Sequence, residues 1–526
     1  MPCRTSRTFT ASVLGALLLN LPALALAAPI EEVVVTGDLR ESALSRLAAP
    51  VTVIDETLIR ERSATHLEDV LITAPNVNIA TGSSRARFIQ IRGIGERGQF
   101  AEPLNPSVGV IVDDVDLSGA ATAATLFDVA QVEVFRGPQA GRYGANALAG
   151  LVVLRTAAPT ELPEGRVELD AGAFDTRRIG AVLSGPLAGP TLTGRLAAQQ
   201  NRSDGWMRNA FLDRDDTAGR DERSLRGRLR WAPTDRFSTD LTLARVDIEN
   251  GYDGFTLDNS FTTLSDAPGR DAQDSRLASL HARLETDRGI DVDLIAAGSD
   301  SRIDYGYDED WTFVGFDPDG YSSTDRYQRD RRTSSLELRI GSERTARRTD
   351  WLVGIFDLNR DVDLERDYSF APGPFASRLR TQRTALFGSL GHALTESLRM
   401  TGSLRVERRD DRYDDSEEVA FTPRETLLGG RAALEWTLDS GALLYGSLSR
   451  GYKAGGFNTD GSLDADLREF ASEAVWNYEL GVKSLHLDGT LATRAAAFVM
   501  TRADQQVATS IVRLRGDGSA EFIDFV

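Results

Sequence analysis

The last two thirds of the chain alternate apolar and polar residues with a period of two. One stretch alternates Leu398, Met400, Gly402, Leu404 and Val406 with Arg399, Thr401, Ser403, Arg405 and Glu407. Because successive side chains of a strand point to opposite faces, this pattern predicts strands with one apolar and one polar face. Segments of about ten residues with this pattern are typical of a transmembrane β-barrel, with lipid outside and a polar lumen inside. A soluble β-sandwich also alternates, so the pattern alone leaves both folds open.

The alternating segments follow one another from residue 162 to the end of the printed sequence. We count about fifteen or sixteen of them, each the length that a tilted spanning strand needs. The long polar stretches 250–274, 305–332 and 360–377 are predicted to be extracellular loops, and 186–190 a short periplasmic turn.

Residues 45–158 have a different pattern, which is typical of a small α+β domain. Strands are predicted at 51–54, 88–95 and 106–117, and a short helix at 65–72. The stretch 132–156 predicts a strand, a glycine-rich turn and a second strand. No Gly-Lys-Ser/Thr follows these glycines, which excludes a phosphate-binding loop.

The N-terminus predicts a signal peptide over residues 1–27. Arg4 and Arg7 precede an apolar run at 9–26, and Ala25-Leu26-Ala27 is a small-x-small cleavage site. A transmembrane anchor is the alternative, but the Ala-rich end and the lack of a stop-transfer pattern favour the signal peptide. This signal also favours the barrel over the soluble sandwich. Cys3 is the only cysteine, so a chain cleaved after the signal has no disulfide or thiol nucleophile.

Composition and charge exclude several functions for the 526 residues. The net charge of −19 argues against nucleic acid as a partner. The histidines are scattered without metal-ligand spacing, and no constellation of an enzyme stands out; they are His66, His281, His392 and His486.

The stretch 132–156 resembles the end of the plug domain of TonB-dependent outer-membrane receptors. The resemblance lies in Arg136-Gly137-Pro138-Gln139, Tyr143-Gly144 and Asn146-Ala147, whereas Ala140 and Ala149 replace family glycines. Further motifs of the family stand in the same order at 88–95 (FIQIRGIG), 106–117 (PSVGVIVDDVDL), 443–458 (LLYGSLSRGYKAGGFN) and 476–484 (WNYELGVKS). In the second of these, Asp114 stands where glycine is usual.

The resemblance implies a β-barrel membrane protein in the cell outer membrane. An N-terminal α+β plug domain, 45–158, would lie in the lumen of a barrel formed by 160–526. The family barrel has about 22 strands, so the resemblance implies a barrel that is incomplete here, in a C-terminally truncated chain. A natural smaller barrel is the alternative.

Residues 31–37 resemble a TonB box, the segment that pairs with the TonB energy-coupling complex of the inner membrane. The predicted TonB-binding residues are Glu31, Glu32, Val33, Val34, Val35, Thr36 and Gly37. Such a β-prone strip can add as a strand to a partner, with main-chain hydrogen bonds for affinity and valine side chains for fit.

Four charged residues are predicted to latch the plug to the barrel. The resemblance suggests that Arg92 and Arg136, each beside a glycine turn, meet glutamates of the barrel wall. Alternation places Glu479 and Glu425 on the lumen face, opposite Trp476 and Leu428. A guanidinium binds a carboxylate in two places and is buried only when paired. Solvated lumen charges are the alternative.

The resemblance implies energised uptake of a scarce ligand, a ferric siderophore, by a monomer in outer-membrane lipid. Arg85, Arg87, Arg97 and Phe100 flank the 88–95 strand and are predicted to face this ligand, since cations suit an anionic iron chelate. Vitamin B12, haem and oligosaccharide are alternative ligands. A truncated receptor that does not transport and a passive porin are alternative functions.

Overall fold

The computed structural model describes residues 33–36, 39, 42–80, 82–96, 105–318, 322–343, 348–458, 468–507, 509–514 and 520–525. The predicted signal peptide, and Glu31, Glu32, Gly37, Arg97 and Phe100 among the predicted site residues, lie outside this part of the chain. Among the described residues, no helix has the length and apolar content needed to cross a membrane.

The N-terminal part is built on a five-stranded sheet in the order β3-β8-β9-β6-β7. The strands are β3 (Val51–Asp55), β8 (Val129–Arg136), β9 (Gly150–Thr156), β6 (Val108–Val112) and β7 (Val115–Asp116). β8 pairs antiparallel with β9, and β6 pairs parallel with β9. The side chains of Phe135, Val152 and Leu154 are fully buried, so the central strands carry the core of this domain.

Short helices and two small ladders surround the sheet. The helical elements are α1 (Glu56–Glu61), α2 (Leu67–Leu71), η1 (Ala121–Ala123), α3 (Ala140–Tyr143) and η2 (Gly144–Asn146). The ladders are β1 (Val34–Val35) with β2 (Ser42–Ala43), and β4 (Val77–Ile79) with β5 (Ile89–Ile91). The helix expected over 65–72 begins later, at Leu67. The Asp69 carboxylate accepts the backbone N–H groups of Thr65 and His66, and this capping sets the N-terminal boundary of the helix.

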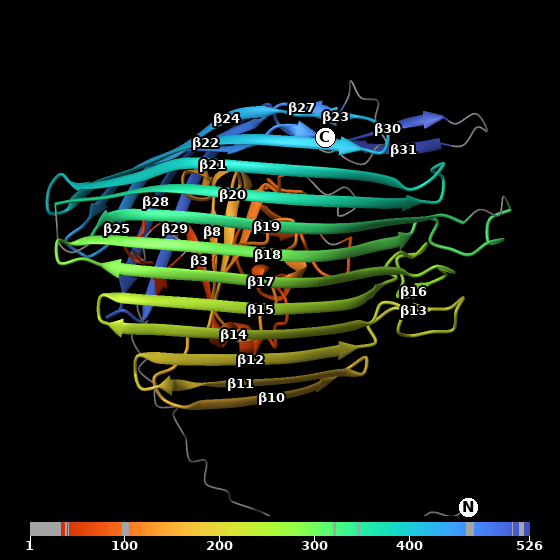
Figure 1. Ribbon diagram of the computed structural model, residues 1–526, viewed down its shortest axis with the longest axis horizontal. Helices are drawn as coiled ribbons and strands as arrows, with labels where there is room; N and C mark the ends of the chain where they lie inside the picture. Colours follow the sequence, from red (N-terminus) through yellow and green to blue (C-terminus); the bar gives the residue numbers. More distant parts are fainter. Residues whose placement is uncertain are drawn as a thin grey trace, which may run out of the picture.

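A single large antiparallel sheet curves around this domain (Figure 1). Fifteen strands follow one another along it. They are β10 (Glu164–Gly172), β11 (Thr176–Ala188), β12 (Leu192–Ser203), β14 (Arg220–Thr234), β15 (Phe237–Tyr252), β17 (Gly269–Glu285), β18 (Ile290–Asp308), β19 (Thr324–Ser342), β20 (Thr349–Tyr368), β21 (Phe375–Ala393), β22 (Leu398–Asp415), β24 (Arg424–Thr437), β25 (Leu443–Lys453), β28 (Glu473–His486) and β29 (Leu491–Ala503). A sixteenth, β23 (Ala420–Phe421), pairs only with β22.

The expected strand number and the incomplete barrel are both confirmed for the described residues. β10 and β29 are the end strands of the sheet and do not pair with each other in this part of the chain. Three further pairs lie outside the sheet: β13 (Arg208–Asn209) with β16 (Thr262–Thr263), β26 (Gly456–Phe457) with β27 (Glu469–Phe470), and β30 (Thr509–Leu514) with β31 (Ala520–Phe525).

The two faces of the barrel sheet have the polarity that the alternation predicts. On β22, Met400, Leu404 and Val406 are exposed on the outer face. Arg405, Glu407 and Arg409 of the same strand are buried on the inner face. The outside therefore suits hydrocarbon and the inside suits a polar plug surface.

The expected long loops are shorter than predicted, because the strands extend into the polar stretches. β20 and β21 leave only 369–374 between them, so most of the stretch 360–377 is strand. The connections between β15 and β17 and between β18 and β19 are 253–268 and 309–323. A spanning strand needs only about 9–11 residues, so the rest of these strands lies where both faces can be polar.

Candidate functional site

The strip Val33–Thr36 lies docked on the plug domain. β1 pairs with β2, with Val34 opposite Ala43 and Val35 opposite Ser42. The side chain of Val35 is fully buried in a cluster with Phe135 and Leu151, whereas Val34 is 43% exposed. The strip that sequence predicts to bind TonB is therefore half inserted into the plug core in this conformation.

Polar side chains of the central plug strands hold the same strip. Glu133 Oε1 accepts from the backbone N–H and the hydroxyl of Thr36, at 2.8 and 2.7 Å. Gln131 Nε2 donates to the Val34 carbonyl at 3.1 Å, and Arg155 Nε donates to Thr36 Oγ1 at 3.1 Å. Sequence reasoning missed these residues, although a carboxylate between Val132 and Val134 in an apolar strand is a signal that could have found Glu133.

The segment that follows the strip lies near the end of the barrel where strands join by short turns. Lys483 Nζ donates to the Leu44 carbonyl at 2.7 Å. Lys483 stands three residues before the end of β28, and only 487–490 separate β28 from β29. Short turns mark the periplasmic end of outer-membrane barrels, so the strip is near the side from which a periplasmic partner would approach.

Two of the four predicted latch residues meet. Arg92 NH2 lies 2.6 Å from Glu479 Oε2, with both side chains almost fully buried. Two further groups of this pair form hydrogen bonds: Arg92 NH1 donates to Asn477 Oδ1 at 3.2 Å, and Tyr445 OH donates to Glu479 Oε1 at 3.0 Å. Gly137 packs so close that an added Cβ would stand 2.9 Å from Arg92 NH1, which explains a glycine after Arg136.

The structure does not bring Arg136 and Glu425 into this latch. Arg136 is half-buried and its NH1 points to the Pro75 carbonyl at 3.5 Å. Glu425 Oε1 accepts the backbone N–H of Gly455 at 3.0 Å. Within the described residues, neither side chain forms an ion pair with the other or with Arg92 or Glu479.

Arg85 and Arg87, which the sequence predicts to face the ligand, are buried in this conformation. Arg85 donates from Nε and NH2 to the Glu222 carboxylate, at 2.7 Å each, and from NH1 to Glu68 at 3.0 Å. Arg87 pairs with Asp271 of β17. Both guanidinium groups pair with carboxylates of the barrel wall, which allows these arginines to be buried.

The Glu68 carboxyl is part of the same cluster. Burial by itself would raise its pKa, but His66 beside it, and then Arg85, hold the pKa well below its usual range. The carboxylate also accepts the backbone N–H of Ala86 at 2.7 Å. An ionised Glu68 thus joins α2, the 82–87 segment and β14.

Two further plug–barrel contacts were not predicted. Lys453 Nζ lies 2.8 Å from Glu96 Oε1, next to the motif that contains Arg92. At the end of α3, Arg405 donates to the Arg142 carbonyl and Arg383 to the Tyr143 carbonyl, at 3.2 Å each. Both arginines also bind the fully buried Glu407.

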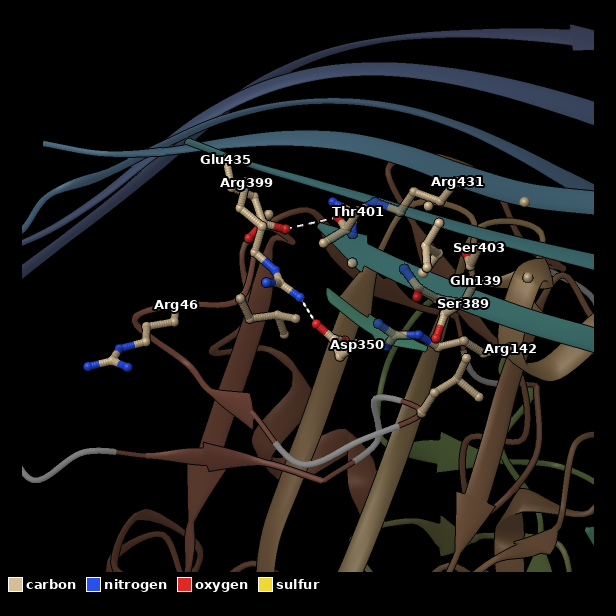
Figure 2. Close-up of a pocket in the computed structure, with 18 of the residues that line it drawn as sticks. Arg46, Gln139, Arg142, Asp350, Ser389, Arg399, Thr401, Ser403, Arg431 and Glu435 are labelled. Carbon is tan, nitrogen blue, oxygen red and sulfur yellow. Dashed lines mark hydrogen bonds and ion pairs between the residues drawn. The ribbon is translucent and has the colours of Figure 1, made fainter. Parts of the chain in front are cut away.

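A small cavity lies between the plug and β20, β21, β22 and β24 (Figure 2). Its volume is about 110 Å³, and its plug side is lined by Leu39, residues 46–48 and the turn around Gln139. Asp350 pairs with Arg399, and Thr401 Oγ1 donates to Glu435 Oε1 at 2.9 Å (Figure 2). Ligand pockets for small molecules measure about 300–1,000 Å³, so this gap admits water but not a chelate. Among the described residues, no group of His, Cys, Asp and Glu could hold a metal ion.

Comparisons with known proteins agree with this architecture. The family model "TonB-dependent Receptor Plug Domain" matches residues 43–151, and "TonB dependent receptor-like, beta-barrel" matches residues 174–520. The chain belongs to the TonB-dependent receptors. Proteins of this family are outer-membrane β-barrels, and the plug-and-barrel fold expected from sequence is confirmed.

Similar receptors are found among both curated proteins and solved structures. The pesticin receptor of Yersinia enterocolitica is 26% identical over 524 residues, covering 94% of this chain and 74% of the relative. The vitamin B12 transporter BtuB of Vibrio vulnificus is 27% identical over 230 residues, covering 42% of this chain and 35% of that protein. The ferric yersiniabactin uptake receptor FyuA of Yersinia pestis superimposes with a TM-score of 0.76 at 22% identity, covering 88% of this chain and 75% of that one. Membership of this family gives the docked strip and the Arg92–Glu479 pair a functional context.

Proposed function

We propose that this TonB-dependent receptor takes up a ferric-siderophore-type ligand across the outer membrane. TonB would pair with residues 31–37 from the periplasmic side. The observation that carries the proposal is the docked strip: a β-prone edge pair, β1–β2, lies on the plug near the short-turn end of the barrel. An extended strip of this kind is suited to strand addition.

The position of the strip links coupling to the closed passage. Leu39 and residues 46–48, which follow the strip, line one side of the cavity between plug and barrel (Figure 2). A partner that pulls on the strip would draw Val35 out of its apolar cluster and move this lining. The gap would widen next to the wall formed by β20–β24, where only water fits now.

The relatives and the inner wall support a ferric siderophore as ligand. The relatives include proteins named pesticin receptor and ferric enterobactin receptor PirA. Arginines face inward along β19 to β22, and those that are almost fully buried are Arg329, Arg331, Arg360, Arg383, Arg405 and Arg409. Arg360, Arg383, Arg405 and Arg409 are paired with carboxylates in this conformation. An anionic chelate that reaches this wall would compete for the same guanidinium groups. Arg97 and Phe100 remain predicted ligand contacts.

The outer face of the barrel sheet supports the proposed contact with lipid. Exposed leucines on successive strands, such as Leu386, Leu404 and Leu480, suit contact with outer-membrane lipid. We infer that the receptor works as a monomer in this lipid. Latching of the plug is proposed for Arg92 and Glu479 only.

The proposal is tested by separating binding from energised uptake. Val34→Pro removes a main-chain donor and resists strand pairing, whereas Val34→Ala keeps the donor. We expect Val34→Pro to abolish TonB-dependent uptake of ferric siderophore in cells while binding to the purified receptor survives, and Val34→Ala to retain uptake. Equal uptake by both variants would contradict the coupling role. Tighter binding of vitamin B12 or haem than of ferric siderophores would contradict the ligand.

A further inference from the structure

Arg155 connects the docked strip to the turn between β6 and β7. Its Nε donates to Thr36 Oγ1 at 3.1 Å, and its NH1 donates to Asp114 Oδ1 at 2.7 Å. Asp114 Oδ2 lies 3.9 Å from His281 Nδ1 on β17 of the barrel wall, and His281 Nε2 lies 3.0 Å from Asp293 of β18. The side chains thus form a continuous polar line from the strip, through the plug, to the barrel.

The backbone at Asp114 is unusual for an aspartate. β6 and β7 are joined by the two residues Asp113 and Asp114, with Val112 paired to Val115. Their φ values are +43° and +73°. Two-residue hairpins with positive φ at both positions favour Asn-Gly or Asp-Gly, because glycine adopts this conformation without strain. An Asp-Asp turn therefore keeps a carboxylate at a position where glycine would be easier.

The contacts of Asp114 explain why the carboxylate is there. Arg155 lies on the central strand β9, and its side chain is 24% exposed, so an anionic partner beside it forms a charge-assisted hydrogen bond that fixes the guanidinium. Asp114 supplies that partner at 2.7 Å. This pairing neutralises the Arg155 charge and orients the guanidinium so that Nε donates to Thr36 Oγ1.

We propose that Asp114 and Arg155 are positioning residues that set how readily the coupling strip leaves the plug. They act together with Glu133, which accepts hydrogen bonds from the backbone N–H and the hydroxyl of Thr36. Loss of Asp114 frees the Arg155 head and removes its hold on Thr36, while the β6–β7 turn gains its preferred residue. The inference rests on the proposed function only in that the strip is taken as the coupling segment. The contacts that keep the strip docked are measured without TonB.

The test uses a cysteine that is buried while the strip is docked. Cys3 is the only cysteine of the chain and is replaced by serine. Val35→Cys then places one thiol at a fully buried position of the strip, and a small apolar thiol suits that site. The rate of maleimide labelling of the folded receptor in detergent reports how often the strip is released. A charge-assisted hydrogen bond corresponds to about a tenfold change in such an equilibrium.

We expect Asp114→Gly to raise the labelling rate at position 35 by about tenfold, and Asp114→Asn, which keeps a hydrogen-bonding oxygen, to raise it less. Asp213→Gly is the matched control, because Asp213 also has positive φ (+51°) and an ion pair with an arginine, Arg208, but lies in a distant loop. This control is expected to leave the rate unchanged. A second cysteine probe, Val152→Cys in the fully buried centre of β9, reports opening of the whole plug.

Two outcomes would overturn the proposal. One is an unchanged rate at position 35 in Asp114→Gly. The other is an equal rise at positions 35 and 152, which would mean that the whole plug has loosened. Binding of the purified periplasmic domain of TonB to the same variants is measured separately. A faster release without any TonB binding would support the positioning role and contradict the proposed coupling.

Discussion

The plug meets the barrel through two unlike regions. Against β15, β17 and β18 the contact has an apolar centre, where Val246, Ile248 and Leu277 join the core cluster of the plug, and the ion pair Arg87–Asp271 lies beside it. Against β20, β21, β22 and β24 the contact is polar and leaves a cavity, with Asp350, Arg399 and Glu435 on its wall (Figure 2). The first region contains a packed apolar cluster, and the second contains polar side chains and a cavity with room for water.

This difference indicates which side of the plug can move. Separating a packed apolar surface exposes that surface to water and leaves a void, whereas separating a wet polar surface exchanges one set of hydrogen bonds for another. Leu39 and residues 46–48, which follow the strip, line the cavity in the second region. We therefore expect a passage to open along β20–β24, while the contact with β15–β18 stays in place.

The largest expected effect concerns the buried pair Arg92–Glu479, which stabilises the plug outside the two regions. Breaking a buried pair leaves an uncompensated charge and costs about 3–5 kcal/mol. We expect Arg92→Met or Glu479→Gln to reduce the free energy of unfolding in detergent by this order, and the double variant to lose less than the sum. Arg136→Met, which breaks no ion pair in the described structure, serves as control. A double-mutant cycle without coupling energy would rule out the latch.

The apolar region is tested by truncating Ile248, which is 1% exposed. Removal of most of a buried isoleucine costs about 2–5 kcal/mol, depending on how far the surroundings collapse. Leu243→Ala on the outer face of the same strand is the matched control, since Leu243 is 52% exposed to the side of the lipid. Chemical unfolding in detergent should show a much larger loss of unfolding free energy for Ile248→Ala than for Leu243→Ala. Equal losses would mean that the plug does not depend on this side.

A substitution in the polar region around the cavity should have a smaller effect on stability. Asp350 and Arg399 pair at the edge of the cavity with partly exposed side chains, and such pairs contribute about 0–1 kcal/mol. Arg399→Gln should therefore leave unfolding almost unchanged. A loss as large as that of Ile248→Ala would contradict the contrast between the two regions.

A separate effect is the dependence of stability on pH through Glu68. Its pKa is lowered in the folded state from 4.5, so its stabilising contribution is complete above this value and is lost as the pH falls below it. The stability difference between the wild type and Glu68→Gln should be constant from neutral pH to about pH 5 and should shrink at lower pH. A difference that stays constant in strong acid would show that the carboxylate is not held ionised.

The sequence alone determined the fold and the faces of the strands. A period of two assigns each residue of a strand to lipid or lumen, which is why the strand number and the inward position of Glu479 were predictable. The motifs around Arg92 and Arg136 identified the plug. The alternation of apolar and polar residues is weaker at strand ends, because the part of a strand outside the hydrocarbon does not need an apolar face. The polar stretch 360–377 therefore predicts a loop where most residues belong to β20 and β21.

Only the tertiary structure decided which inward charges meet. Alternation gives a residue's face but not the rotation of the plug within the barrel, and that rotation brings Arg92 rather than Arg136 to Glu479. The same rotation buries Arg85 and Arg87 against Glu222 and Asp271. The hold on Thr36 depends on Glu133 and Arg155, which are separated from it by about a hundred residues of chain. Contacts between residues so far apart follow from the packing of whole elements, and no local pattern specifies them.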